Sequence, residues 1–297
     1  MEQMENIDIH VPQPPAEEQP PKKKSCLGRL IVFAAAVFII WWANNYLLFT
    51  TEENISSDKV SNEIKLAVIS DQHASTGMFA ISNKAIIKKI NKIDPDVVCV
   101  LGDMHSNDAT EEEKKISLDL MTDILDAGYK MYFVLGEHDD RTNEYVSKME
   151  AKGVNVLDQE YETVEIKDTD ITFYGISNAY FSEYFDLRNE FDLNPDTYNV
   201  LLAHIPRYDD YELFGADLTL CGDTHGGIIQ VPFMGPAYFE DEFLPELLGD
   251  GKPVYDKGLF ENDNGYMFIT SGIGNSPLPA RFNNFPEVAE ITIKPNK

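Results

Sequence analysis

Hydrophobic positions along the chain form one long block near the amino end and a series of short runs after residue 63. The long block covers residues 30–49 and contains no charged residue. The short runs, such as IKLAVIS, VVCVLG, VLLAH and LTLCG, are bounded by Asp, Gly, His and Pro. Short apolar runs with such boundaries are typical of strands that are buried on both faces. The chain after residue 63 is therefore predicted to contain a largely buried sheet.

Helical patterns lie between the first strands. Residues 79–93 carry isoleucines at helical spacing. Residues 110–128 predict a second helix, with Thr110 as its amino-terminal cap, an acidic first turn and Gly128 at its end. Strands that alternate with helices favour βαβ units and an α/β fold. Further along, the pattern predicts a hairpin over residues 161–177, strands over 199–204 and 217–223, and closing strands over 265–272 and 287–295.

The amino-terminal segment is predicted to be an uncleaved signal anchor. Residues 1–29 are polar and rich in Pro and Glu, end in a basic stretch and are expected to be disordered in the cytoplasm. Residues 30–49 are long enough to cross about 30 Å of hydrocarbon. The basic flank predicts a single-pass protein of the cell membrane with its remaining chain outside the cytoplasm. No small-residue cleavage site follows. We therefore expect a linker over residues 50–62 and one domain over residues 63–297.

Charge and cysteine content narrow the classes of function. The 297 residues include 24 Lys and Arg against 51 Asp and Glu, a formal net charge of -27. Such a chain repels phosphate backbones, so we expect no nucleic acid partner. The three cysteines, Cys26, Cys99 and Cys221, form no closely spaced pair, which argues against a disulfide framework and a zinc ribbon.

The predicted strands share one feature: five of them end in carboxylates or imidazoles. These residues are Asp71, His73, Asp103, Glu137, His138, His204, Asp223 and His225. A single Gly-Asp after a strand is ordinary turn chemistry, and a single His is usually a satisfied polar group. Five strand ends at one edge of an α/β sheet would bring these groups together. Clustered carboxylates repel each other unless cations compensate them. Mixed Asp and His ligands suit Mn²⁺, Fe or Zn²⁺ better than Ca²⁺.

The order of these motifs resembles the calcineurin-like metallophosphoesterases. The motifs, in chain order, are D-x-H at Asp71, G-D at Asp103, G-x-H-D at His138, a single His204, and G-x-x-H-G-G, which contains His225. The segments DLTLCGDTHGGIIQVPFMGP and SGIGNSPLPARFNNFPEVAEITI are most similar to the membrane-linked bacterial branch of that family. The resemblance implies a four-layer α/β sandwich with two central β-sheets. It also implies hydrolysis of a phosphoester by a hydroxide that bridges two divalent metal ions.

The resemblance assigns a role to each matching position. The first metal would be held by Asp71, His73, Asp103 and His225, and Asp103 would bridge to the second. The second metal would use His204 with Glu137 and Asp223, where the family normally has Asn and His. His138, together with Asp103, would be catalytic and would stabilise the phosphoryl group or protonate the leaving oxygen. Outside the matched motifs, the sequence offers Asp139 or Asp140 to orient His138. Arg281 and Asn283 are expected to fix their loop, and the alternative is contact with a substrate phosphate.

The two departures affect the expected cofactor. Glu137 and Asp223 keep oxygen donors, and the added negative charge favours Mn²⁺, with Fe, Mg²⁺ or Zn²⁺ as alternatives. The substrate would be a phosphoester, either a small molecule or a lipid-linked phosphate. The alternative is a catalytically weak or inactive domain of the same fold that acts as a ligand-binding or sensor module in the cell envelope. A purely structural envelope protein is a third reading, and the sequence leaves the oligomeric state open.

Overall fold

The computed structural model describes residues 26–77, 80–139, 142–177, 186–275 and 280–296. The chain divides into a unit that ends at Phe38 and a compact unit over Ile39–Lys297. Helix α1 (Cys26–Tyr46) begins in the first unit and ends in the second. Its segment Leu27–Tyr46 is long enough and apolar enough to cross a membrane. The helix thus stops three residues before the end of the predicted apolar block over residues 30–49.

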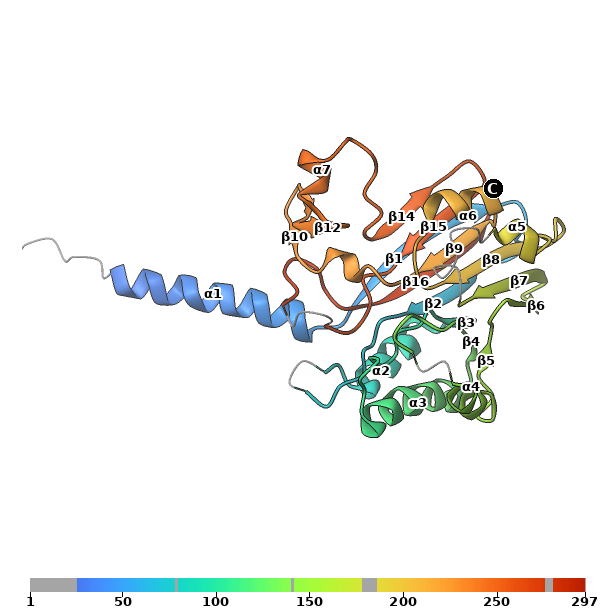
Figure 1. The fold of residues 1–297 in the computed structure, drawn as a ribbon, viewed down its shortest axis with the longest axis horizontal. Helices are drawn as coiled ribbons and strands as arrows, with labels where there is room; N and C mark the ends of the chain where they lie inside the picture. Colours follow the sequence, from blue (N-terminus) through green and yellow to red (C-terminus); the bar gives the residue numbers. More distant parts are fainter. Residues whose placement is uncertain (1–25, 78–79, 140–141, 178–185, 276–279, 297) are drawn as a thin grey trace, which may run out of the picture. The chain divides into compact units, whose positions relative to one another are not determined.

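Two six-stranded sheets form the centre of the second unit (Figure 1). The first contains, in spatial order, β1 (Phe49–Ser57), β16 (Glu287–Pro295), β2 (Ile64–Ile69), β3 (Val97–Val100), β4 (Lys130–Phe133) and β5 (Asn155–Val156). The second contains β14 (Gly258–Glu261), β15 (Tyr266–Ile269), β9 (Leu218–Cys221), β8 (Tyr198–Ala203), β7 (Thr169–Ile176) and β6 (Glu160–Ile166). The pairs β16–β2, β14–β15 and β6–β7 are antiparallel, and the other neighbours within these sheets are parallel.

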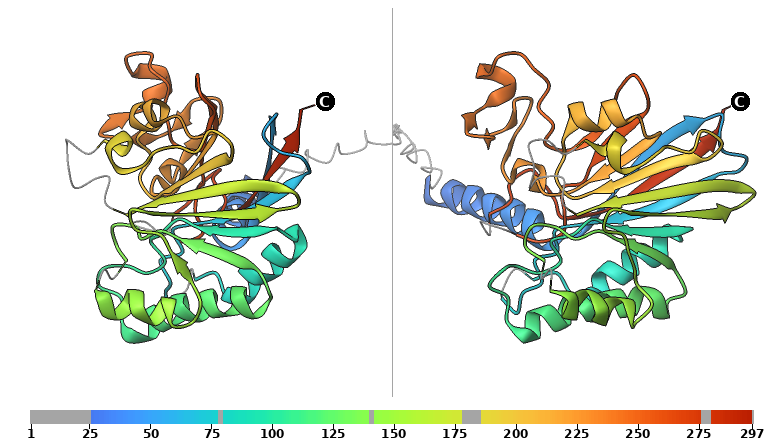
Figure 2. Two further views of the ribbon diagram at one scale, coloured as in Figure 1. Left: turned by 90° about the vertical axis from the view of Figure 1, so that its right-hand side faces the viewer. Right: turned by 45° about the vertical axis from the view of Figure 1, so that its right-hand side comes forward.

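Helices cover the outer face of each sheet, which makes four layers (Figure 2). Helices α2 (Asn83–Ile93), α3 (Glu111–Asp126) and α4 (Asn143–Glu150) pack on the first sheet. Helices α5 (Leu187–Glu190) and α6 (Tyr208–Phe214) pack on the second. Between the sheets lies a core made mainly of aliphatic and aromatic side chains from both of them. The predicted α/β sandwich with two central sheets is therefore confirmed.

The cap of α3 follows the sequence prediction. The Thr110 hydroxyl accepts a hydrogen bond from the backbone N–H of Glu113, and the Glu113 carboxylate accepts one from the backbone N–H of Thr110. This reciprocal pair satisfies donors that a helix start leaves open. Gly128, just after the helix, has a φ of 91°, a left-handed backbone conformation that glycine adopts without strain.

The expected linker over residues 50–62 differs from the structure. Phe49–Ser57 is strand β1, and it pairs in parallel with β16 at the edge of the first sheet. Its side chains are mostly polar and at least partly exposed, and only Ile55 is buried. The strand is held mainly by backbone pairing, so its side chains carry no apolar signal. The chain passes from α1 into the sheet with only two residues between them.

Smaller elements follow β9. They are the short helix η2 (His225–Gly227), the hairpins β10 (Gln230–Val231) with β11 (Gly235–Pro236) and β12 (Tyr238–Phe239) with β13 (Glu242–Phe243), and helix α7 (Pro245–Leu248).

Candidate metal centre

All the predicted site residues lie just after strands that point the same way. Asp71 and His73 follow β2, Asp103 follows β3, Glu137 and His138 follow β4, His204 follows β8, and Asp223 and His225 follow β9. Because these strands belong to both sheets, the site lies across the end of the sandwich. Within the described residues, three groups have ligand atoms within 4.8 Å of one another.

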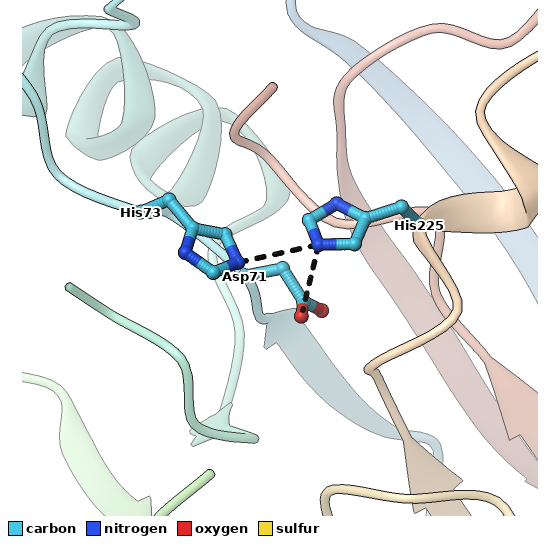
Figure 3. Close-up of side chains that lie close together, drawn as sticks. All are labelled: Asp71, His73 and His225. Atoms are coloured by element: carbon cyan, nitrogen blue, oxygen red, sulfur yellow. Dashed lines mark hydrogen bonds and ion pairs between the residues drawn. The ribbon is translucent and has the colours of Figure 1, made fainter. Parts of the chain in front are cut away.

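The first group joins Asp71, His73 and His225 (Figure 3). The Nε2 atoms of His73 and His225 are 3.2 Å apart, and His225 Nε2 is 3.7 Å from Asp71 Oδ1. All three side chains are buried. Burial lowers the pKa of His73 to about 4 and that of His225 well below its ordinary value. Both rings are therefore neutral at pH 7, which is the form of imidazole that binds metals.

The second group joins Asp71, Asp103 and His204. His204 Nδ1 lies 2.6 Å from the carbonyl oxygen of Leu101 and donates to it, which directs Nε2 toward the carboxylates. Nε2 is 3.2 Å from Asp103 Oδ2 and 3.9 Å from Asp71 Oδ1. Burial disfavours the His204 cation, but the contact with Asp103 and the charge of Asp71 outweigh it and raise the pKa of His204 to about 10. Without a metal, this proton supplies the positive charge between the carboxylates.

Two buried atoms in this group have no hydrogen-bond partner: Asp71 Oδ1 and His204 Nε2. Burial raises the pKa of Asp71 to about 7 even though His204 opposes the shift. Leaving a buried polar atom unpaired costs about 1–3 kcal/mol, more when the group is charged. Divalent cations bound by carboxylate oxygens and imidazole nitrogens would satisfy both atoms. The residues present therefore fit such ions.

The third group joins Asp103, Glu137 and His138 at the outer side of the site. Asp103 Oδ1 accepts a hydrogen bond of 2.8 Å from the backbone N–H of His138. His138 Nε2 is 3.8 Å from Asp103 Oδ2 and 3.4 Å from Glu137 Oε1. Asp223 lies on the same side, with its Oδ1 3.7 Å from His204 Nε2. The Glu137 side chain is 44% exposed and that of Asp223 31%, whereas Asp103 is buried. Both positions that depart from the family pattern thus lie where water has access.

Residues that orient the imidazoles were missed from the sequence. The Ser106 hydroxyl lies 3.0 Å from His73 Nδ1, and the Asn107 amide nitrogen lies 2.9 Å from His138 Nδ1. Both residues follow Asp103 in the same loop, and this proximity is the only feature of the sequence that indicates a role at the site. The expected orienting residue Asp139 is buried and instead accepts hydrogen bonds from three backbone N–H groups, those of Asp103, Met104 and Gly136. The other expected residue, Asp140, lies outside the described part of the chain.

The loop near the carboxyl end supports His225 from behind. Arg281 is buried and donates hydrogen bonds to the carbonyl oxygens of Ser271 and Gly274, and its Nη2 lies 3.4 Å from His225 Nδ1. Asn284 Nδ2 donates to the carbonyl oxygen of His225 at 2.7 Å. The expected role of Arg281 in fixing its loop agrees with these contacts.

The end of α1 holds this loop. Asn45 Oδ1 accepts a hydrogen bond from the Arg281 N–H at 3.0 Å, and its Nδ2 donates to the Arg281 carbonyl oxygen at 3.1 Å. Asn44 Oδ1 accepts from the Asn284 N–H at 3.0 Å. Both asparagines are buried. The last turn of α1 is thus part of the structure behind the site.

The backbone at the site is strained. Five predicted ligands have positive φ values between 40° and 69°: Asp71, His73, Asp103, Asp223 and His225. Non-glycine residues seldom adopt this conformation, and such residues concentrate at functional sites. The space around the carboxylates is also restricted. A Cβ at Gly136 would overlap with Asp103 Oδ1, and one at Gly222 would lie 2.7 Å from Asp71 Oδ2.

The fold and the site together define a metal-dependent phosphoesterase of the calcineurin type. The sequence profile of the calcineurin-like phosphoesterase family matches residues 64–227, more than half of the chain. The chain therefore belongs to this family and is a phosphoester hydrolase.

Individual relatives agree with this class. The metallophosphoesterase YkuE of Bacillus subtilis (strain 168) is 28% identical over 256 residues, which cover 82% of this chain and 85% of the relative. A transmembrane protein with a metallophosphoesterase domain from Bos taurus is 23% identical over 254 residues, which cover 78% of this chain and 53% of the relative. Among solved structures, TT1561 of Thermus thermophilus aligns over 70% of this chain and 89% of its own, with a TM-score of 0.44 and 10% identity.

Proposed function

We propose that the protein is a phosphoesterase that α1 anchors in the membrane, that uses two divalent cations, and whose site lies outside the cytoplasm. The observation that supports this proposal is the convergence of seven ligand-type side chains from five loops, with two buried atoms, Asp71 Oδ1 and His204 Nε2, that have no hydrogen-bond partner. The buried half of the site would hold one cation between Asp71, His73, Asp103 and His225. The second cation would be held by Asp103, which also contacts the first, together with His204, Glu137 and Asp223. Mn²⁺ is the preferred ion for so carboxylate-rich a set.

Bound divalent cations supply Lewis acidity and lower the pKa of water at such sites. The protein's own contribution is position and proton transfer. Asn107 fixes the ring of His138, whose Nε2 faces the site from its solvent-accessible edge. At that place His138 can donate a proton to the leaving oxygen or a hydrogen bond to the phosphoryl group. Asp103 holds the His138 backbone and so keeps the acid at a constant position relative to the cations.

The basic residues before α1 support a cytoplasmic amino end. A test of this orientation uses Leu213→Cys, because Leu213 is 59% exposed on α6. A membrane-impermeant thiol reagent should label the introduced cysteine in intact cells, whereas Cys26 should react only after lysis. The reverse pattern would place the site in the cytoplasm.

Activity is tested with the purified full chain on p-nitrophenyl phosphate and bis(p-nitrophenyl) phosphate in the presence of Mn²⁺. We expect metal-stimulated hydrolysis of at least one ester, and a loss of roughly 100-fold or more in Asp103→Asn, the scale on which electrostatic stabilisers act. The matched control is Asp170→Asn, because Asp170 is an exposed carboxylate on β7. Binding of Mn²⁺ and phosphate without turnover would instead favour the sensor alternative. Equal activity of the Asp103→Asn variant and the wild-type protein would refute the proposed site.

A further inference from the structure

Exposed apolar side chains gather in one part of the domain. In the described chain outside residues 27–49, ten large apolar side chains are exposed. Only Tyr161 and Leu213 lie elsewhere. We call residues 229–248 the apolar insertion. Seven of the other eight lie in it, namely Ile229, Phe233, Met234, Tyr238, Phe243, Leu247 and Leu248, and the eighth is Phe282. A grouping of this kind marks a contact surface, whereas single exposed apolar residues need no explanation.

The insertion is a folded element. It consists of the two hairpins β10–β11 and β12–β13 and helix α7. The rings of Tyr238 and Phe243 lie 5.0 Å apart, and the backbone N–H of Leu244 donates to the carbonyl oxygen of Ala237. Phe233, in the turn between β10 and β11, is fully exposed and has a φ of 68°. Such a conformation costs a bulky residue free energy, and no burial within the domain offsets it.

Hydrogen bonds connect the insertion to the end of α1. Phe282 forms a parallel bridge with Ile229, and its carbonyl oxygen accepts from the Gln230 N–H at 2.9 Å. The adjacent Arg281 is held by Asn45 through two hydrogen bonds. One peptide bond therefore separates the residue held by α1 from the residue held by the insertion. Figure 1 accordingly shows β10, β12 and α7 on the side of the domain where α1 ends.

If α1 spans the membrane, its last turn lies at the membrane surface, and the insertion lies there too. We propose that the apolar insertion is a second membrane contact, with Phe233, Phe243, Leu247 and Leu248 entering the lipid interface near the last turn of α1. This inference rests on the proposed membrane anchoring and not on the hydrolytic activity. The contact would also hold the domain, and with it His225 just before the insertion, at a fixed orientation to the lipid headgroups.

The charge of the insertion specifies the kind of lipid surface. It carries the four carboxylates Glu240, Asp241, Glu242 and Glu246 and no basic residue. Attraction to anionic headgroups is therefore excluded, and binding must come from apolar side chains that enter a neutral or zwitterionic interface. A second copy of the chain is the less suitable occupant, because each copy has a net charge of -27 and the two would repel each other.

The experiment places a fluorescent probe at Phe233→Cys in the full chain, with Cys26→Ser, reconstituted in phosphatidylcholine nanodiscs. The remaining cysteines, Cys99 and Cys221, are buried. Lipids with a nitroxide at a shallow acyl position should quench this probe at least twofold. The matched control is Leu213→Cys, equally apolar and 59% exposed, which should not be quenched.

Two further outcomes separate the inference from the proposals on which it depends. If the chain does not enter nanodiscs at all, the anchoring by α1 fails. If the chain enters nanodiscs and the nitroxide lipids do not quench the probe at position 233, the insertion proposal alone is overturned. The same holds if a second copy of the chain, rather than lipid, covers the probe. Replacing phosphatidylcholine by phosphatidylglycerol should weaken the quenching at low salt. Stronger quenching in the anionic lipid would contradict the charge argument.

Discussion

Replacing Asn45 with alanine should destabilise the domain strongly although Asn45 belongs to the amino-terminal helix. Its side chain is fully buried, and it bonds to both the N–H and the carbonyl oxygen of Arg281. In Asn45→Ala both backbone groups would lose their partner in the protein interior. Each such group costs about 1–3 kcal/mol, so we expect a loss of about 2–6 kcal/mol in the free energy of unfolding. For a domain of this size each kcal/mol lowers Tm by about 2–4 °C, which gives a shift of roughly 4–24 °C.

The assay is thermal unfolding of the full chain, followed by near-ultraviolet circular dichroism in one detergent. The matched control is Asn54→Ala on β1, where the lost hydrogen bond comes from Lys294 at the exposed surface. Its effect should stay within about 0.5 kcal/mol. Because the loop after Arg281 also supports His225, Asn45→Ala should weaken Mn²⁺ binding as measured by electron paramagnetic resonance. If both variants melt at the same temperature, the last turn of α1 is only a tether and the reasoning is refuted.

Three other predictions concern the site itself. Gly136→Ala should abolish Mn²⁺ binding in calorimetric titrations, because the new methyl group would collide with Asp103 Oδ1; unchanged affinity would show that the loop can move away. In metal-free protein, the lowered pKa of His73, about 4 against an ordinary 6.5, gives a contribution to stability that is complete above pH 6.5 and lost as pH falls toward 4, whereas the raised pKa of Asp71, about 7, gives an opposite contribution that grows as pH falls below 7. The His73 contribution changes by about 1.4 kcal/mol per pH unit, about 3 kcal/mol in all, so the difference in unfolding free energy between the wild-type protein and His73→Asn should change between pH 7 and pH 5, and a constant difference in urea titrations would contradict it. The double variant Glu137→Asn, Asp223→His should shift the metal content from Mn²⁺ toward Zn²⁺ in elemental analysis, since it removes two negative charges and adds an imidazole.

Strands with strong apolar runs were predictable, and strand β1 was not. Residues 64–69 and 97–100 are buried on both faces, so their sequences are almost wholly apolar. Strand β1 buries only Ile55, and at the sheet edge it pairs with β16 through its backbone. Backbone pairing leaves no side-chain pattern, so polar residues such as Glu52 and Glu53 were interpreted as a linker.

The candidate ligands were predictable because they share a position, the carboxyl end of a strand. The residues that support them share no pattern. Asn45 and Arg281 are 236 positions apart, and only the folded chain brings them together. In the sequence, Asn44 and Asn45 only weaken the end of an apolar segment. Their partners, the backbone groups of a distant loop, cannot be identified from residue types.

The two halves of the site differ in a way that predicts unequal metal binding. His73 and His225 are buried and neutral, so the inner half offers preformed nitrogen ligands next to Asp71. The outer half has exposed carboxylates at Glu137 and Asp223, where water competes for the ion. In addition, His204 must release its proton before its Nε2 can bind. We therefore expect one tightly held ion and one exchangeable ion whose affinity rises with pH. Two equivalent, pH-independent Mn²⁺ sites in calorimetry would be incompatible with this arrangement.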